Sequence, residues 1–69
     1  MNYFEYARYR IKNIRRKKRL KQSYMANLLG ISYRKYLLIE QGKISLTHIL
    51  LIKIIGFLDI SFSEFNKNF

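Results

Sequence analysis

The sequence predicts an all-α fold, a compact domain of five helices. Three observations support this class. Apolar residues recur at spacings of three and four, no segment alternates apolar and polar residues as a half-buried strand does, and the chain contains no proline. With 69 residues, of which 49% are apolar, the chain is expected to form one domain with a thin core. The predicted domain therefore covers residues 1–69.

The first helix is expected near the N-terminus, over about 15 residues with one apolar face. Residues spaced by three and four form that face, namely Phe4, Ala7, Ile11 and Ile14. Arginine and lysine fill much of the remaining helix surface, and both residue types favour helices.

Two shorter helices are expected next. The first has its apolar face at Leu28, Leu29 and either Tyr24 or Met25. It ends at Gly30, because glycine adopts the positive φ of a helix C-terminus without steric cost. The following helix begins with Ser32 as N-cap, carries Tyr36 and Ile39 on its inner face, and stops at Gly42.

The last two helices are predicted from their capping residues. Thr47 is a suitable cap for an apolar helix from Ile49 to Leu58. Ser61 and Glu64 have the spacing of a capping box, in which each side chain accepts from the other's backbone N–H. This box opens a short final helix that carries Phe65.

Positive charge is concentrated in the first half of the chain. The whole sequence has 14 basic and 4 acidic residues, a net charge of +10, and all of this excess lies in residues 1–35. From Arg8 to Lys21 basic residues occur without any acid, the electrostatic pattern of a protein that binds a polyanion. The alternative is a solvated cationic helix that keeps the protein in solution. Within this run, Arg8, Arg10 and Lys12 are expected to contribute a long-range field rather than contacts with the polyanion.

Composition argues against several other classes of protein. Without cysteine and with a single histidine, the chain offers no conventional metal cluster, and no metal or other cofactor is expected. Four acidic residues and one histidine supply no set of nucleophile, base and orienting group. No enzyme, catalytic residue or small-molecule substrate is therefore expected, and His48 is expected at the surface. No apolar run reaches membrane-spanning length, and no membrane partner is expected.

The most informative segment is a helix-turn-helix pattern over residues 22–41. Each key residue has a steric role there: a small residue where the helices cross, glycine in the turn, and apolar residues inside the second helix. These residues are Ala26, Gly30, Tyr36 and Ile39, with Leu29 and Ile31 on either side of the turn. Together they resemble the helix-turn-helix of the lambda-repressor-like, Cro-type family, also called the xenobiotic response element family.

This resemblance extends over residues 11–65. Its further segments are Ile14-Arg15 before Leu20, Gln22 with Ala26, Leu29 to Ser32, Ile39 to Lys43, and Leu58 to Phe65. The resemblance implies a single Cro-type domain that binds double-stranded DNA through the second and third helices. The expected location is the cytoplasm, in association with the nucleoid.

The resemblance also implies roles for individual residues on the DNA side. The base-reading positions are Tyr33, Arg34, Lys35 and Leu38. Arginine forms bidentate hydrogen bonds with guanine acceptors, so Arg34 is the first candidate for a base contact. Lys35 serves a base or a phosphate. Tyr33 and Leu38 contact a thymine methyl group, the sugar-phosphate backbone or no DNA at all. The phosphate-binding positions are Gln22, Lys21, Arg19, Lys18 and Lys43. Of these, Lys43 resembles a loop residue that approaches phosphate with both its backbone and its side chain.

Two charges are assigned to structure by the same resemblance. Arg15 and Glu40 match an ion pair that joins the first helix to the end of the third. Three departures from the family pattern have structural consequences. Arg19 replaces a glycine and must adopt a left-handed conformation or alter the helix end, Lys21 replaces a serine cap, and the Tyr36 hydroxyl needs a partner at the surface or different packing.

These features favour a sequence-specific transcriptional regulator. The expected protein is a repressor that binds a two-fold symmetric operator as a homodimer. One short recognition helix reads only a few base pairs, which is why two subunits are expected. The dimer contact is placed in the neutral C-terminal half, at Ile49, Phe57, Phe62, Phe65 and Phe69. The alternative is a helix-turn-helix fold that binds protein, as an antitoxin or an inhibitor of an acidic partner. Leu37 and Leu38 favour that alternative, because polar residues are usual at their positions.

Overall fold

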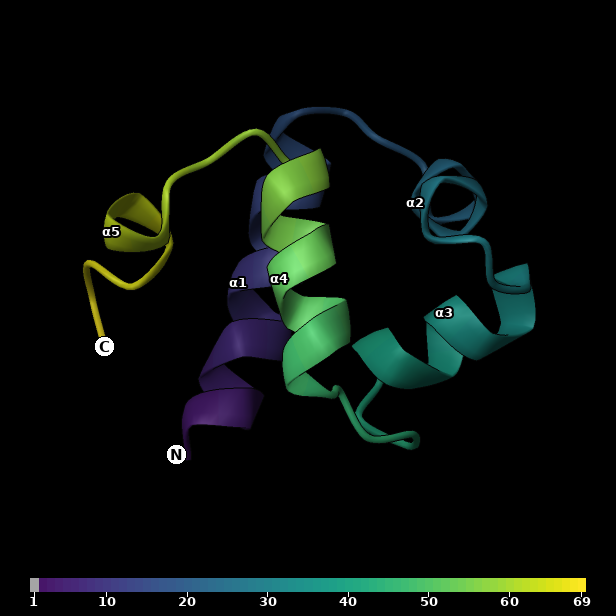
Figure 1. Ribbon diagram of the computed structural model, residues 1–69, viewed down its shortest axis with the longest axis horizontal. Helices are drawn as coiled ribbons and strands as arrows, with labels where there is room; N and C mark the ends of the chain where they lie inside the picture. Colours follow the sequence, from purple (N-terminus) through teal and green to yellow (C-terminus); the bar gives the residue numbers. More distant parts are fainter. Residues whose placement is uncertain (1) are drawn as a thin grey trace.

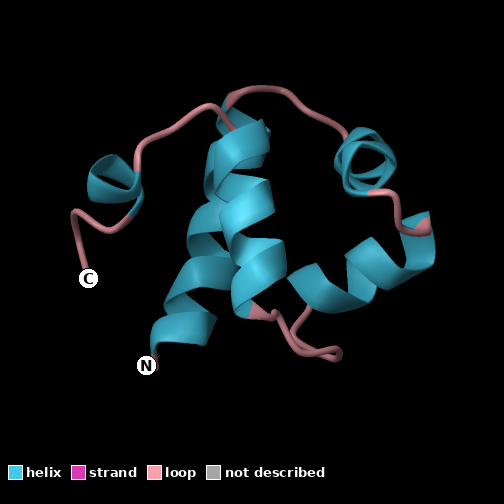
Figure 2. Ribbon diagram, in the orientation of Figure 1, coloured by secondary structure: helices cyan, strands magenta, loops and turns pink. Residues whose placement is uncertain are grey.

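The computed structural model describes residues 2–69, which form five helices and no strand (Figure 2). The helices are α1 (Tyr3–Lys17), α2 (Gln22–Leu29), α3 (Tyr33–Glu40), α4 (His48–Phe57) and α5 (Phe62–Phe65). The predicted all-α class is confirmed. The boundaries agree to within a residue or two, the fourth helix beginning at His48 and not at Ile49.

Side-chain caps begin four of the five helices. Ser32, Thr47 and Ser61 each accept a hydrogen bond from the backbone N–H three residues further on, as predicted. Asn2 does the same for α1. Lys21 precedes α2 without a side-chain cap, so the first N–H groups of α2 are left for solvent or a ligand.

The capping box at α5 forms only in part. Ser61 accepts from the Glu64 N–H at 3.1 Å, but the Glu64 carboxylate does not return to Ser61. It accepts from Lys67 Nζ at 2.9 Å instead. A basic residue one turn away therefore competes with the backbone for this carboxylate, which the spacing alone did not reveal.

Left-handed backbone ends several helices. Gly30 closes α2 with φ of 70°, as predicted for glycine. Arg19 has φ of 59° after α1, and Asp59 has φ of 56° after α4. Arg19 thus takes the left-handed conformation that the missing glycine demands, at a steric cost of roughly 1–2 kcal/mol.

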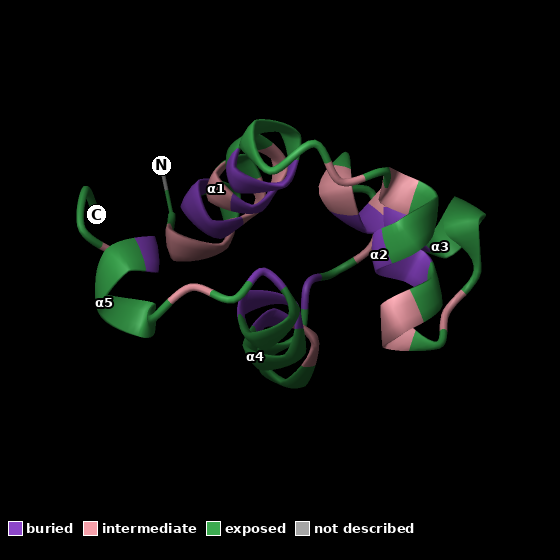
Figure 3. Ribbon diagram, turned by 90° about the horizontal axis from the view of Figure 1, so that it is seen from above, coloured by how far each residue is buried: buried purple, intermediate pink, exposed green. Residues whose placement is uncertain are grey.

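The helices surround a core formed where α1, α2, α3 and α4 meet. Both α1 and α2 pack against α3 and α4. Figures 1 and 3 show α2 and α3 on one side of the α1 and α4 pair and α5 on the opposite side. Buried residues face inward from every helix (Figure 3), for example Ile11, Met25, Tyr36, Ile54 and Phe65.

The position of Phe65 differs from the prediction that it lies at a dimer contact. Its side chain is 0% exposed, so it belongs to the core and its expected role in a dimer contact is wrong. Tyr6 packs edge to face against its ring, and the Arg10 guanidinium lies 5.8 Å from the ring centroid. The other residues expected at the dimer contact are exposed, namely Ile49, Phe57, Phe62 and Phe69.

Residues 2–69 contain neither a membrane-spanning helix nor a cluster of metal ligands. None of these helices combines the length and apolar character that crossing a membrane requires. No group of three or more histidine, cysteine, aspartate or glutamate side chains lies close enough together there to hold a metal ion.

Candidate nucleic-acid interface

The helix-turn-helix consists of α2, a three-residue turn and α3. The turn is held by the Ile31 N–H, which donates to the Ala26 carbonyl at 3.1 Å, and by the Gly30 N–H, which donates to the Asn27 carbonyl at 3.1 Å. Ala26 is buried, as expected for the small residue where the helices cross. Ile31 packs against the core and anchors the turn.

One face of α3 is buried and the other is open. Tyr36 and Ile39 are buried on the inner face, whereas the whole first turn, Tyr33 to Lys35, is exposed. Arg34 and Leu38 lie four residues apart and so share the outward face. The structure therefore brings these base-reading candidates together on one surface, although Leu38 is only partly exposed.

Arg15 and Glu40 form a buried ion pair that joins α1 to α3. The Arg15 Nε donates to Glu40 Oε2 at 3.0 Å, and Nη2 donates to Oε1 at 2.9 Å. The third nitrogen, Nη1, donates to the Leu20 carbonyl at 2.8 Å. The two side chains are 8% and 4% exposed. A two-pronged pair of this kind fixes both distance and orientation, so it sets the angle between α1 and α3.

Gln22 adds a third member to this network. Its Nε2 donates to Glu40 Oε1 at 3.0 Å, which ties the start of α2 to the end of α3. Burial alone would raise the pKa of Glu40, but Arg15 above all, then the neighbouring Tyr36 hydroxyl and Gln22, outweigh burial and lower that pKa. Glu40 therefore stays ionised, and the second amide hydrogen of Gln22 is left for another acceptor.

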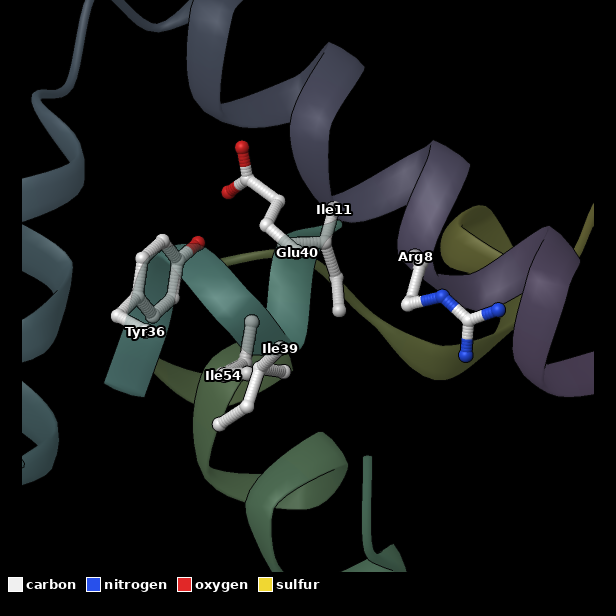
Figure 4. A pocket seen from close by; sticks show the side chains of 6 residues that line it. All are labelled: Arg8, Ile11, Tyr36, Ile39, Glu40 and Ile54. Atoms are coloured by element: carbon white, nitrogen blue, oxygen red, sulfur yellow. The ribbon is translucent and has the colours of Figure 1, made fainter. Parts of the chain in front are cut away.

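The Tyr36 hydroxyl is a buried polar group next to this network. It is fully buried beside Glu40 and α1 (Figure 4), yet it finds no hydrogen-bond partner within residues 2–69. The space beside it has no room for a water molecule. Burial, and then the neighbouring Glu40 carboxylate, raise the pKa of Tyr36 well above its ordinary value. Of the two expected outcomes for the Tyr36 hydroxyl, a partner at the surface or different packing, the structure shows the second, because the hydroxyl is enclosed in the core.

The candidate phosphate-binding lysines and arginine lie in the connections before α2 and after α3. Lys18, Arg19 and Lys21 are exposed in the connection between α1 and α2, next to the uncapped start of α2. Lys43 is also exposed, but its backbone N–H donates to the Leu38 carbonyl at 2.8 Å. Its backbone is thus committed to ending α3, and only its side chain can reach a phosphate.

Two arginines that were expected to act on the polyanion through a long-range field also make contacts within the fold. Arg10 donates to the carbonyls of Phe65 and Glu64, each at 2.9 Å. Arg8 packs on Gly42, where a Cβ atom would come within 2.9 Å of the arginine Nε. Both contacts join residues far apart in the chain, so helical spacing carried no signal of them. His48 is exposed, as predicted.

The geometry agrees with one comparison to known proteins. A family model described as helix-turn-helix matches residues 11–65, which runs from the middle of α1 to the end of α5. No curated protein and no solved structure is significantly similar to the chain. The family match covers most of the chain, and the five-helix arrangement is that of a lambda-repressor-like domain. The chain therefore belongs to the helix-turn-helix family of DNA-binding domains.

Proposed function

We propose that this protein is a sequence-specific transcriptional regulator, a repressor that occupies a two-fold symmetric operator as a homodimer. The observation that carries the proposal is the exposed first turn of α3, with Tyr33, Arg34 and Lys35 in succession. The major groove of DNA admits an α-helix, and helix-turn-helix proteins contact base edges with the first residues of the second helix. Arg34 suits guanine, and Leu38 suits a thymine methyl group.

Phosphate contacts position this helix. Cationic side chains and free N–H groups at a helix start both favour phosphate, and both occur at the connection from α1 to α2. The residues proposed for these contacts are Lys18, Arg19, Lys21, Gln22 and Lys43. The network of Arg15, Glu40 and Gln22 holds α3 in a fixed pose while the contacts form.

Dimerisation is proposed because α3 has only eight residues and reads few base pairs by itself. Two subunits double the number of bases read, and the two-fold axis of the protein then matches that of the operator. Exposed apolar side chains of α4 and the C-terminal segment supply the contact, namely Ile49, Ile52, Phe57, Phe62 and Phe69. Ile52 was not among the residues predicted from the sequence, although it lies three residues after Ile49 on the same helix face.

Protein binding through α3 is the less favoured function. The hypothesis depends on Leu37 and Leu38, and both side chains are partly buried. The apolar surface that they offer to a partner is therefore small, whereas the cations around α3 remain exposed.

Selection of bound sites from a random pool of duplexes tests the proposal most directly. A two-fold symmetric consensus is the expected result, with two half-sites about one helical turn apart. The affinity for the selected duplex should then fall linearly, on logarithmic scales, as salt is raised. Absence of duplex binding at low salt would overturn the proposal, and an asymmetric single site would overturn the homodimer.

A further inference from the structure

A groove between α1 and α5 lies largely outside the surface proposed for DNA and shares only Lys18 with it. Its volume is about 430 Å³, within the range of many ligand-binding clefts. Four cationic side chains line it, Arg10, Lys17, Lys18 and Lys67, together with the single carboxylate of Glu64. Arg10, Lys17 and Lys67 therefore give the groove a positive charge that the proposed DNA contacts do not use.

The groove and α3 lie on different faces of α1. Arg10, Ile14 and Lys17 recur at the spacing of one helical face and point into the groove. Arg15 belongs to another face, the one that contacts α3. Figures 1 and 3 show α5 on the opposite side of the molecule from α2 and α3, so a duplex seated on α3 leaves the groove accessible.

One cation in the groove is held rigidly in place. The Arg10 guanidinium is bound by the carbonyls of Phe65 and Glu64 and lies over the Phe65 ring. Its acceptors are neutral carbonyls, so they orient its charge without cancelling it. The single carboxylate, that of Glu64, accepts from Lys67 Nζ at 2.9 Å. The four cations of the groove still exceed its one acid, and the Lys67 ammonium has further N–H donors for a second carboxylate.

The groove floor is apolar. Ile14 and Ile60 line it beneath the charged side chains, and none of the lining residues in the described chain is aromatic. A nucleic-acid strand would find cations there but no ring on which to stack its bases. A protein segment with both carboxylate and aliphatic side chains matches the rim and the floor together.

We propose that the α1–α5 groove binds an acidic segment of a partner protein that also carries aliphatic side chains. The carboxylates of this segment pair with Arg10, Lys17 and Lys67, and its aliphatic groups cover Ile14 and Ile60. The surface would allow the protein to hold DNA and a protein partner at the same time, because the two ligands occupy opposite sides of the molecule.

Amide chemical shifts of the isotope-labelled protein test this groove. The probe is a short synthetic peptide of alternating leucine and glutamate, with a leucine and lysine peptide as control. The acidic peptide should move the amide signals of Asn13, Lys17, Ile60 and Lys67 and leave those of Tyr33 to Lys35 in place. A saturating amount of random duplex should not displace it.

Paired substitutions make the test quantitative. Lys17→Ala with Lys67→Ala should weaken peptide binding by about tenfold, because charge pairs at the rim are lost. Lys12→Ala with Lys53→Ala removes the same charge outside the groove and should change binding by less than about twofold. The inference is overturned by any of four results: equal loss in both double variants, shifts centred on α2 and α3, displacement by duplex, or tighter binding of inorganic triphosphate than of the peptide. Since DNA binding is measured separately, failure here leaves the proposed DNA-binding function untouched.

Discussion

Arg34 and Lys43 carry the same charge but occupy different surroundings. Arg34 stands on the outward face of α3 in its exposed first turn, where a side chain can reach a base edge. Lys43 follows the end of α3 with its N–H already bonded to Leu38, so it offers only a flexible ammonium group. The two residues are therefore expected to affect binding in different ways.

Replacing Arg34 with alanine should relax base preference at one position in each half-site, at a cost of about 1–3 kcal/mol for the preferred base. Lys43→Ala should weaken all sequences alike and reduce the slope of affinity against salt by about one phosphate contact. Affinities for a panel of single-base variants at several salt concentrations separate these effects. Uniform weakening by both substitutions would show that Arg34 reads no base.

The buried Tyr36 hydroxyl predicts a stabilising substitution. This hydroxyl lies beside Glu40 but makes no hydrogen bond of normal geometry, and there is no room for water next to it. Tyr36→Phe therefore removes a desolvated donor while keeping the ring. The free energy of unfolding should rise by about 1 kcal/mol. Urea denaturation measures this change, and Tyr6→Phe serves as the control, since the Tyr6 hydroxyl donates to the Phe65 carbonyl and its removal should destabilise. Destabilisation by Tyr36→Phe would mean that its hydroxyl is bonded.

Among the secondary-structure elements, the connection between α1 and α2 combines a strained backbone conformation with a cluster of cationic side chains. Arg19 has a positive φ where glycine would be unstrained, and it stands among the cations proposed for phosphate. A residue chosen for stability alone would be glycine at this point. The arginine side chain is therefore expected to serve phosphate binding, at the expense of a less favourable backbone conformation.

Arg19→Gly should raise the free energy of unfolding by about 1 kcal/mol through relief of strain and weaken binding to every duplex. Asp59→Gly is the matched control, because Asp59 has almost the same φ but follows α4. It should stabilise the fold without weakening DNA binding. Thermal unfolding and duplex titration of both variants test the pair, and unchanged affinity in Arg19→Gly would remove Arg19 from the phosphate-binding set.

At the scale of the whole molecule, the Arg15 and Glu40 ion pair determines how α1 and α3 sit together. The folded protein lowers the pKa of Glu40 below its ordinary value of 4.5. Stability from this pair is therefore fully present above that value and is lost as pH falls through the lower folded pKa. Removing one partner is costly because the other charge stays buried.

Melting temperature should accordingly fall as pH decreases below about 4.5, with part of the fall due to Glu40. Glu40→Gln should lower the free energy of unfolding at neutral pH by about 3–5 kcal/mol and flatten the acid response. Glu5→Gln controls for loss of an exposed carboxylate. Calorimetry across this pH range provides the measurement, and an equal acid response in the Glu40→Gln variant would contradict the assignment.

The proposed homodimer depends on exposed apolar side chains of α4. Ile49 is 68% exposed on α4, so Ile49→Glu should leave the fold intact and shift a dimer towards monomers. Tyr9→Glu alters a comparably exposed side chain on α1 and should leave the assembly unchanged. Sedimentation velocity distinguishes the two variants. A wild-type chain that stays monomeric on its operator would contradict the dimer.

The helices of this protein and the outward face of its helix-turn-helix could be predicted from the order of residues alone. Helical periodicity, the caps at Ser32, Thr47 and Ser61, and the glycine turn at Gly30 depend on neighbours a few residues away, so they can be read from the order of residues. The exposed position of Arg34 follows from the same local spacing, because a helix with a buried face at Tyr36 and Ile39 must point Arg34 outward.

Contacts between side chains far apart in the chain became visible only in the folded protein. It buried Phe65 instead of leaving it for a partner, bound Arg10 to the carbonyls of α5, joined Gln22 to Glu40 and enclosed the Tyr36 hydroxyl. These outcomes depend on how α1, α3 and α5 pack, and packing is a collective result of shape and volume over the whole core. For that reason the charge of Arg10 could be counted from the sequence, whereas the groove that it lines could be found only in the folded chain.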